Sequence, residues 1–330
     1  MSPTVSVVIP VHNRPLPVRR AIESVLAQTW QDFEIIVVDD GSTEAVAAAV
    51  AAISDHRLAL VKHDRNRGGS AARNTGIQAS SAPFVAFLDS DDEWLPTKLA
   101  RQLEVFARSG DRLGLVYTGS ERIFADGSVE RYIPRRGTDL ARALLTVNVV
   151  GAASVGMIRR RAVDATAGFD ESLPSSQDMD LWLRICERFP ADFVPEVLVR
   201  VFQGSDRGRI TANLDAMSKG RELFCQKHRE KLVQHRLLHR YLRDSGWMYQ
   251  REVRDAGLAR RCYLESLAMR PIAPITCILL LAACLPMSWL DRVARWKHQL
   301  IAFRRAVFEA VLRRGRNRPA PDTAQGNRAE

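Results

Sequence analysis

The sequence predicts an α/β fold: a mostly parallel sheet with helices on both faces, followed by an α-helical C-terminal region. Over the first half of the chain, segments rich in branched apolar residues alternate with segments of helical period, the order typical of a covered parallel sheet. The strand-like segments are apolar almost throughout, as expected when both sides are buried. From about residue 211 onward the pattern is almost wholly helical.

The individual elements can be assigned in chain order. VSVVIPV at 5–11 has the length of a strand, and the next segment places Val18, Ile22, Val25 and Leu26 on one helical face. Further strands are expected at 33–42, 58–63, 84–88 and 114–120, helices at 70–79 and 97–109, and a hairpin around Asp126 and Gly127.

Charge is distributed unevenly along the chain. The net charge is +10, yet residues 1–203 contain 23 Lys/Arg against 26 Asp/Glu, whereas residues 204–330 contain 25 against 12. We expect an α/β domain at 1–205, a basic helical extension at 206–318 and a disordered polar tail at 319–330.

The cysteines and the apolar stretches of the sequence indicate where in the cell the protein is expected. Five scattered cysteines without a CxxC pair favour reduced thiols in a cytosolic protein. The N-terminus lacks the pattern of an export signal. The apolar stretch 272–290 is interrupted by Pro274 and Pro286, which favours a buried or interfacial helix over a membrane span.

Polar side chains are concentrated where the expected strands end, and ligands bind at that edge of open parallel sheets. Asp89, Asp91 and Asp92 stand within four residues and repel one another, so a divalent cation with a phosphorylated substrate would compensate their charge. One alternative is that the acids cap the next helix. A phosphatase is a further alternative, but the first strand does not end in the Asp that it would require.

Two further stretches have more than one interpretation. RNRGGSAARNTG at 65–76 suits contact with phosphate or sugar, and a plain helix-entry turn equally well; it is neither a P-loop nor a dinucleotide fingerprint. In QDMDLWLR, Asp178 and Asp180 fall in or before the first turn of a helix. There they could cap the helix, or one of them could act as a general base.

The chain resembles the family 2 glycosyltransferases, which have the GT-A fold. Five motifs in order carry the resemblance over roughly residues 3–205: VSVVIPVHNRP, QDFEIIVVDDGST, NRGGSAARNTGI, FVAFLDSDDEW and SSQDMDLWLRI. It implies an inverting, hexosyltransferase-type enzyme that uses a nucleotide-diphosphate sugar donor and Mg²⁺ or Mn²⁺. The implied acceptor is a glycan or lipid-linked hydroxyl in the assembly of cell-surface polysaccharide or glycan.

The resemblance also assigns roles to matching residues. Asp178 would deprotonate the acceptor, and Asp91 would bind the metal. The resemblance gives Asp92 no role, and we expect it only to cap a helix. Asp89 would join Asp91 as a metal ligand and lie nearer the ribose or sugar of the donor. The remaining donor and nucleotide contacts are Pro10, Val11, Asn13, Asp40 at the base, Arg73 and Asn74.

One position departs from the family pattern. Many relatives carry a His after the last strand of the catalytic domain, whereas this chain reads VFQGSDRGR. Gln203, Arg207 or Arg209 would have to take its place, which leaves the full metal ligand set open. His12, in the first loop, is expected near the nucleotide without a catalytic role.

The basic helix at 292–314 has one apolar side, which suits an anionic membrane surface and packing in a helical bundle equally well. The expected location is cytoplasmic, with attachment to the inner face of the cell membrane left open. A sugar nucleotidyltransferase would carry a Gly-rich loop directly after the first strand, and this chain does not. A nonenzymatic basic protein that binds nucleic acid is a further alternative, but no recognition motif supports a nucleic-acid partner.

Overall fold

The computed structural model describes residues 2–137, 139–203 and 213–285. They fall into two compact units, one running to Ser245 and the other starting at Gly246. The domain boundary expected after residue 205 stays a prediction.

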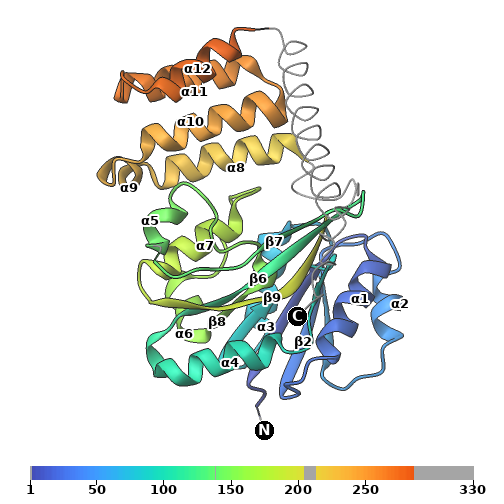
Figure 1. The fold of residues 1–330 in the computed structure, drawn as a ribbon. Coiled ribbons are helices and arrows are strands. Elements are labelled where there is room, and N and C mark those ends of the chain that lie inside the picture. The colour runs from blue at the N-terminus through green and yellow to red at the C-terminus, as the bar shows by residue number, and fades with distance from the viewer. Residues whose placement is uncertain (1, 138, 204–212, 286–330) are drawn as a thin grey trace, which may run out of the picture. The chain divides into compact units, whose positions relative to one another are not determined.

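The first unit is built around a single sheet (Figure 1). Its described strands are β1 (Val5–Val11), β2 (Phe33–Asp39), β3 (Leu58–Lys62), β4 (Phe84–Phe87), β5 (Asp92–Trp94), β6 (Leu115–Phe124), β7 (Val129–Tyr132), β8 (Gly156–Arg159) and β9 (Ala191–Gln203). Their order is β3-β2-β1-β4-β8-β6-β9-β5, with β7 paired to β6. Strands β3, β2, β1, β4, β6 and β9 run in one direction, and β8, β5 and β7 run against it. The predicted α/β class with a mostly parallel sheet is confirmed.

The helices that alternate with these strands are α1 (Pro15–Leu26), α2 (Val46–Ala51), α3 (Gly69–Ala79), α4 (Lys98–Ser109), α5 (Leu140–Leu144), α6 (Arg160–Thr166) and α7 (Gln177–Cys186). A run of helices follows β9: α8 (Leu214–Lys227), α9 (Arg229–Gln234) and α10 (Leu238–Met248), the last of which extends into the second unit. Helix α3 packs on β1 and β2, and α4 packs on β6 and β9 (Figure 1). Single 3₁₀ turns occur at Gly110–Arg112 and Ala153–Val155.

Apolar periodicity explains why the first elements form where the sequence predicts them. Helix α1 begins with Pro15, whose fixed φ and missing N–H suit a first helical turn, and it buries Val18, Ile22 and Val25 on one face. Strand β1 is buried along almost its whole length, because helices cover both sides of the sheet. The expected hairpin is also confirmed: β6 and β7 pair, and Gly127 takes a φ of +79° in their turn.

The second unit contains a π-helical turn (Tyr249–Val253), α11 (Ala256–Met269) and α12 (Pro274–Ala283). Ala259 and Tyr263 of α11 and Ala283 of α12 form its buried cluster. Within the described part of the chain, no helix has the length and apolar character needed to cross a membrane. The end of the apolar stretch 272–290, from residue 286 onward, lies outside the described residues. So does the basic helix expected at 292–314.

Candidate active site

The carboxyl ends of β1, β2 and β4 meet at one edge of the sheet, as predicted. Parallel pairing sets Val11 of β1 beside Asp39 of β2. The Leu88 N–H, just after β4, donates to the Val8 carbonyl at 3.0 Å, which brings the acidic turn to the same edge. Pro10 and Val11 are part of β1 itself, and the Val11 side chain is buried.

Asn13 joins the loops that follow β1 and β2. Its backbone is left-handed, with φ +52°, and its side-chain oxygen accepts from the N–H groups of Thr43 at 2.8 Å and Glu44 at 3.2 Å. Its own N–H donates to the Ser42 hydroxyl at 2.9 Å. Asn13 therefore shapes this end of the site, and its direct contact with a nucleotide stays a prediction.

Asp40 is buried and fixes a third loop. Its carboxylate accepts from the N–H groups of Arg67 and Gly68, both at 2.8 Å, and lies 2.7 Å from His63 Nδ1. The His12 ring lies 2.9 Å from the Asp40 carbonyl, in the loop position expected for it. These bonds tie the Gly-rich loop at 65–69 to the end of β2, and the base contact predicted for Asp40 is untested.

The three aspartates after β4 have separate partners. Asp89 pairs with Arg73 of α3 at 2.5 Å, Asp91 pairs with Arg14 at 3.0 Å, and Asp92 accepts from the Ser154 hydroxyl at 2.6 Å. The next helix, α4, begins only at Lys98, with Thr97 at its N-cap position.

The capping explanation for these acids is therefore wrong, and so is the capping role expected for Asp92. Asp92 opens strand β5, which pairs with β9, so a short strand separates the acids from the helix. The predicted need for compensating positive charge is met by the two arginines, one from the β1–α1 loop and one from α3.

The pair Asp89 and Asp91 fits a divalent cation that shares its coordination with a substrate. Mg²⁺ takes one or two carboxylates and commonly completes its shell with phosphate oxygens and water. Among the described residues, no three His, Cys, Asp or Glu side chains gather to hold an ion alone. Gln203 ends β9, whereas Arg207 and Arg209, the other candidates for the missing His, lie outside the described residues.

Asp178 lies in the first turn of α7. Its Oδ2 accepts from the Ala153 N–H at 3.2 Å, while its Oδ1 is buried and has no hydrogen-bond partner among the described residues. Burial raises the pKa of Asp178 to about 6; the positive charge of Arg73 opposes the rise, and the carboxylate of Asp89 adds to it.

Arg73 connects the acidic turn to α7. It is buried and donates to Asp89 and, at 3.2 Å, to the side-chain oxygen of Gln177. Burial alone would lower the pKa of Arg73, but the charges of Asp89, Asp178 and Asp91 raise it. The predicted donor residues Arg73, Asp89 and Asp91 and the predicted base Asp178 therefore share one electrostatic environment.

Several buried polar atoms around this environment lack a partner within the described residues. Besides Asp178 Oδ1 they are Arg14 Nη2, Ser70 Oγ and Arg73 Nε. A buried polar group without a partner is costly, so these atoms are available to a polar ligand. Three of the four belong to residues that pair with, or are charge-coupled to, the acidic turn.

Asp180, the other acid of α7, faces a different network. It is fully buried, accepts from Arg184 and His228 at 2.8 Å each and pairs with Lys227 at 2.9 Å. Burial would raise the pKa of Asp180, but His228 and the two cations lower it to about 2. The structure thus separates two acids that the sequence left equivalent.

Asn74 is also directed away from the acidic turn. Its side-chain amide donates to the Phe169 carbonyl at 2.9 Å and its oxygen accepts from the Phe169 N–H at 2.8 Å. A contact between Asn74 and the donor remains a prediction.

The 3₁₀ turn Ala153–Val155 was missed by sequence reasoning. Ser154 accepts from the Asp89 N–H at 3.1 Å and donates to Asp92, while the Ala153 N–H holds Asp178. One turn thus positions acids from two distant segments. The only available signal was a single hydroxyl within the small-residue run GAASVG.

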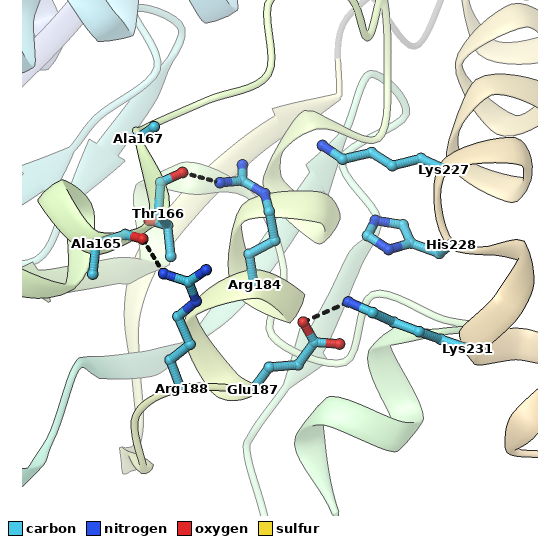
Figure 2. Close-up of a pocket in the computed structure, with 9 residues that line it drawn as sticks. All are labelled: Ala165, Thr166, Ala167, Arg184, Glu187, Arg188, Lys227, His228 and Lys231. Atoms are coloured by element: carbon cyan, nitrogen blue, oxygen red, sulfur yellow. Dashed lines mark hydrogen bonds and ion pairs between the residues drawn. The ribbon is translucent and has the colours of Figure 1, made fainter.

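A cavity of about 390 Å³ elsewhere in the first unit shares no residue with this site. It is lined by Ala165, Thr166, Ala167, Arg184, Glu187, Arg188, Lys227, His228 and Lys231 (Figure 2). Its cations are engaged: Arg184 donates to the Gly168 carbonyl at 2.8 Å, and Lys231 pairs with Glu187 at 2.7 Å. These bonds connect α7 to its neighbours.

Comparison with known proteins gives a consistent result. The model of the family described as "Glycosyl transferase family 2" matches residues 6–167. An uncharacterized glycosyltransferase of Rickettsia felis is 31% identical over 212 residues, which are 62% of this chain and 35% of that protein. The succinoglycan biosynthesis protein ExoO of Rhizobium meliloti is 43% identical over 113 residues, 34% of this chain and 32% of that protein.

A third relative, the UDP-Glc:alpha-D-GlcNAc-diphosphoundecaprenol beta-1,3-glucosyltransferase WfgD of Escherichia coli, is 33% identical over 129 residues, 39% of this chain and 50% of that protein. The chain spans about a third of the length of the Rickettsia felis relative.

Solved structures share the fold at low identity. S. aureus TarS 1-349 in complex with UDP-GlcNAc has a TM-score of 0.59 and 16% identity, covering 85% of this chain and 84% of that one. The mannosyltransferase PcManGT from Pyrobaculum calidifontis, in complex with GDP-Man and Mn²⁺, has a TM-score of 0.55 and 16% identity, covering 86% and 80%. The likeness confirms the predicted GT-A fold.

Proposed function

Since this chain belongs to glycosyl transferase family 2, we propose that it transfers a hexose from a nucleotide-diphosphate donor to an acceptor hydroxyl in polysaccharide or glycan assembly. The observation that carries the proposal is the Asp89–Arg73–Asp178 arrangement, in which a buried carboxylate oxygen of Asp178 lacks a partner among the described residues. The names of ExoO, WfgD and TarS support the class of pathway and of donor.

The donor side of the proposed reaction is the acidic turn with its two arginines. Asp91 and Asp89 would hold a divalent cation, Mg²⁺ or Mn²⁺, which when bound would neutralise charge on the leaving diphosphate. Arg14 and Arg73 pair with these carboxylates in the structure, and each keeps one nitrogen that has no partner among the described residues, so they can also bind phosphate oxygens. The PcManGT complex with GDP-Man and Mn²⁺ supports a metal-dependent reaction.

The acceptor side is Asp178. With a pKa of about 6 its carboxylate is mostly ionised at neutral pH and more basic than an ordinary Asp, which suits a general base. The unpartnered Oδ1 can take the proton of an acceptor hydroxyl, and Ala153 holds the other oxygen in place. Attack opposite the leaving group would invert the anomeric centre.

A screen of nucleotide sugars for Mn²⁺-dependent binding tests the donor side. We expect wild type to bind one donor class and Asp91→Ala to lose the metal-dependent part of that affinity. Asp164→Asn, at an exposed acid of α6, is the control and should bind as wild type does. Equal metal-dependent binding by Asp91→Ala would overturn the assignment. Pyrophosphate release from a sugar phosphate and a nucleoside triphosphate would instead identify a nucleotidyltransferase.

A further inference from the structure

Helix α12 exposes large apolar side chains along one face. Ile275, Ile278 and Leu281 are 60%, 64% and 69% exposed, and Ile272 and Leu285 extend the exposed face at either end. Single exposed apolar residues are ordinary, but a continuous apolar face that is exposed to water indicates an interaction site.

Helix α12 exposes apolar side chains and buries its hydroxyl side chain, the reverse of what is usual for a helix that faces water. From Pro271 to Leu285 the sequence contains no charged residue, and the only hydroxyl side chain, Thr276, is buried. A surface helix of a soluble protein turns polar residues outward and apolar residues inward. The outer face of α12 therefore suits a nonaqueous neighbour.

The exposed face is held in place by the packing of the opposite one. Ala283 is buried in a cluster with Tyr263 and Ala259 of α11, and Leu279 and Leu280 pack against that cluster. Arg260 also donates to the Ala283 carbonyl at 3.2 Å. The apolar residues are thus presented by a docked helix.

Charge identifies the kind of neighbour. By sequence, residues 246–330 carry a net charge of +8, from 15 Lys/Arg and 7 Asp/Glu; the described residues 246–285 account for +2 of it, from 5 Arg and 3 Asp/Glu. Arg270, two residues before Ile272, is exposed, as is Arg261 on α11. A segment with this excess of positive charge is attracted to an anionic lipid surface.

We propose that the outer face of α12 lies in the headgroup region of an anionic lipid bilayer, with the exposed Arg261 and Arg270 of the same unit at the phosphates. A ten-residue helix is about 15 Å long, roughly half the hydrocarbon thickness of a bilayer, so α12 would lie along the surface. The binding surface is Ile272, Ile275, Ile278, Leu281 and Leu285.

Vesicle co-sedimentation of the full chain tests the proposal without donor or acceptor, so its outcome is independent of the proposed catalytic function. Wild type should bind vesicles of phosphatidylcholine mixed with phosphatidylglycerol, and less in high salt or with phosphatidylcholine alone. The double variant Ile278→Glu/Leu281→Glu should bind about tenfold more weakly or worse. Both positions are exposed, so thermal unfolding should not change.

The matched control is Val129→Glu/Val233→Glu, which adds the same charge at exposed valines of the first unit and should bind as wild type does. Equal binding by the α12 variant and wild type would overturn the proposal, as would failure of wild type to bind anionic vesicles. A wild-type dimer that the α12 variant loses, without vesicle binding, would assign the face to a second copy of the chain.

Discussion

The two carboxylate oxygens of Asp178 differ in their hydrogen bonding, and this difference leaves one of them available to accept a proton. Oδ2 accepts from the Ala153 N–H, whereas Oδ1 is buried without a partner among the described residues. Burial disfavours the charged form and raises the pKa to about 6. The Asp178 carboxylate is therefore more basic than that of an exposed Asp, and the nearby positive charge of Arg73 limits the rise in its pKa.

The first prediction concerns the pH dependence of transfer. A general base must be ionised, so kcat/KM for the acceptor should rise as pH increases through about 6 and level off above it. Arg73 lowers the pKa of Asp178, so Arg73→Met should move this limb to higher pH, whereas Arg108→Met, at an exposed arginine of α4, should not. A limb near pH 4 in wild type would contradict the role of burial.

At the scale of elements, loops after different strands hold one another in place. Gly41, directly after Asp40, has a φ of +68°, and a Cβ there would lie 2.3 Å from the carbonyl carbon of Arg65. The close approach of the loop at 65–69 to the end of β2 thus depends on the absence of a side chain.

Gly41→Ala should therefore lower the free energy of unfolding by more than the strain of its positive φ alone, because the added Cβ would also collide with Arg65. Gly127→Ala is the control, because Gly127 has a similar φ of +79° but open space around a Cβ. We expect about 1 kcal/mol for Gly127→Ala and a further 1–3 kcal/mol or so for Gly41→Ala, measured by denaturant unfolding. Equal losses would show that the two loops can separate without cost.

The elements also show what the sequence could predict. Strand β1, helices α1 and α3 and the convergence of strand ends follow from apolar periodicity and the rule for parallel sheets. Strand β5 has only three residues and depends on pairing with β9, about a hundred residues later, so no local pattern indicates it. The same holds for the turn at Ala153–Val155, whose role lies entirely in its contacts with distant acids.

At the scale of the whole molecule, Asp180 connects the sheet domain to the helices that follow it. Its partners Lys227 and His228 lie at the end of α8 and just after it, within the first unit. The sequence predicted acids at this turn but could not distinguish Asp178 from Asp180, because the distinction depends on side chains almost fifty residues away. Asp178 keeps an oxygen without a partner among the described residues, as its proposed role requires, whereas Asp180 is held by three side chains.

Asp180→Asn should therefore destabilise the first unit by about 2–4 kcal/mol, because Arg184 and Lys227 would lose a buried counter-charge. Asp111→Asn, which removes an exposed acid paired with Arg159, should cost no more than about 0.5 kcal/mol. The pKa of Asp180 is lowered to about 2, so its contribution is present above pH 3.8 and is lost as pH falls toward 2. A stability difference between the variant and wild type that does not narrow over this range would contradict the assignment.

The central claim is that Asp178 is the base of a glycosyl transfer whose donor binds at Asp89 and Asp91. The most direct measurement compares Asp178→Asn with wild type in donor affinity and in transfer rate, using a donor found by the binding screen. Asparagine keeps the shape and removes the charge that burial disfavours, so the variant should unfold at no lower temperature at pH 7. We predict unchanged donor affinity and a loss of about 10²-fold or more in kcat. Transfer at the wild-type rate by a fully folded Asp178→Asn would contradict the account.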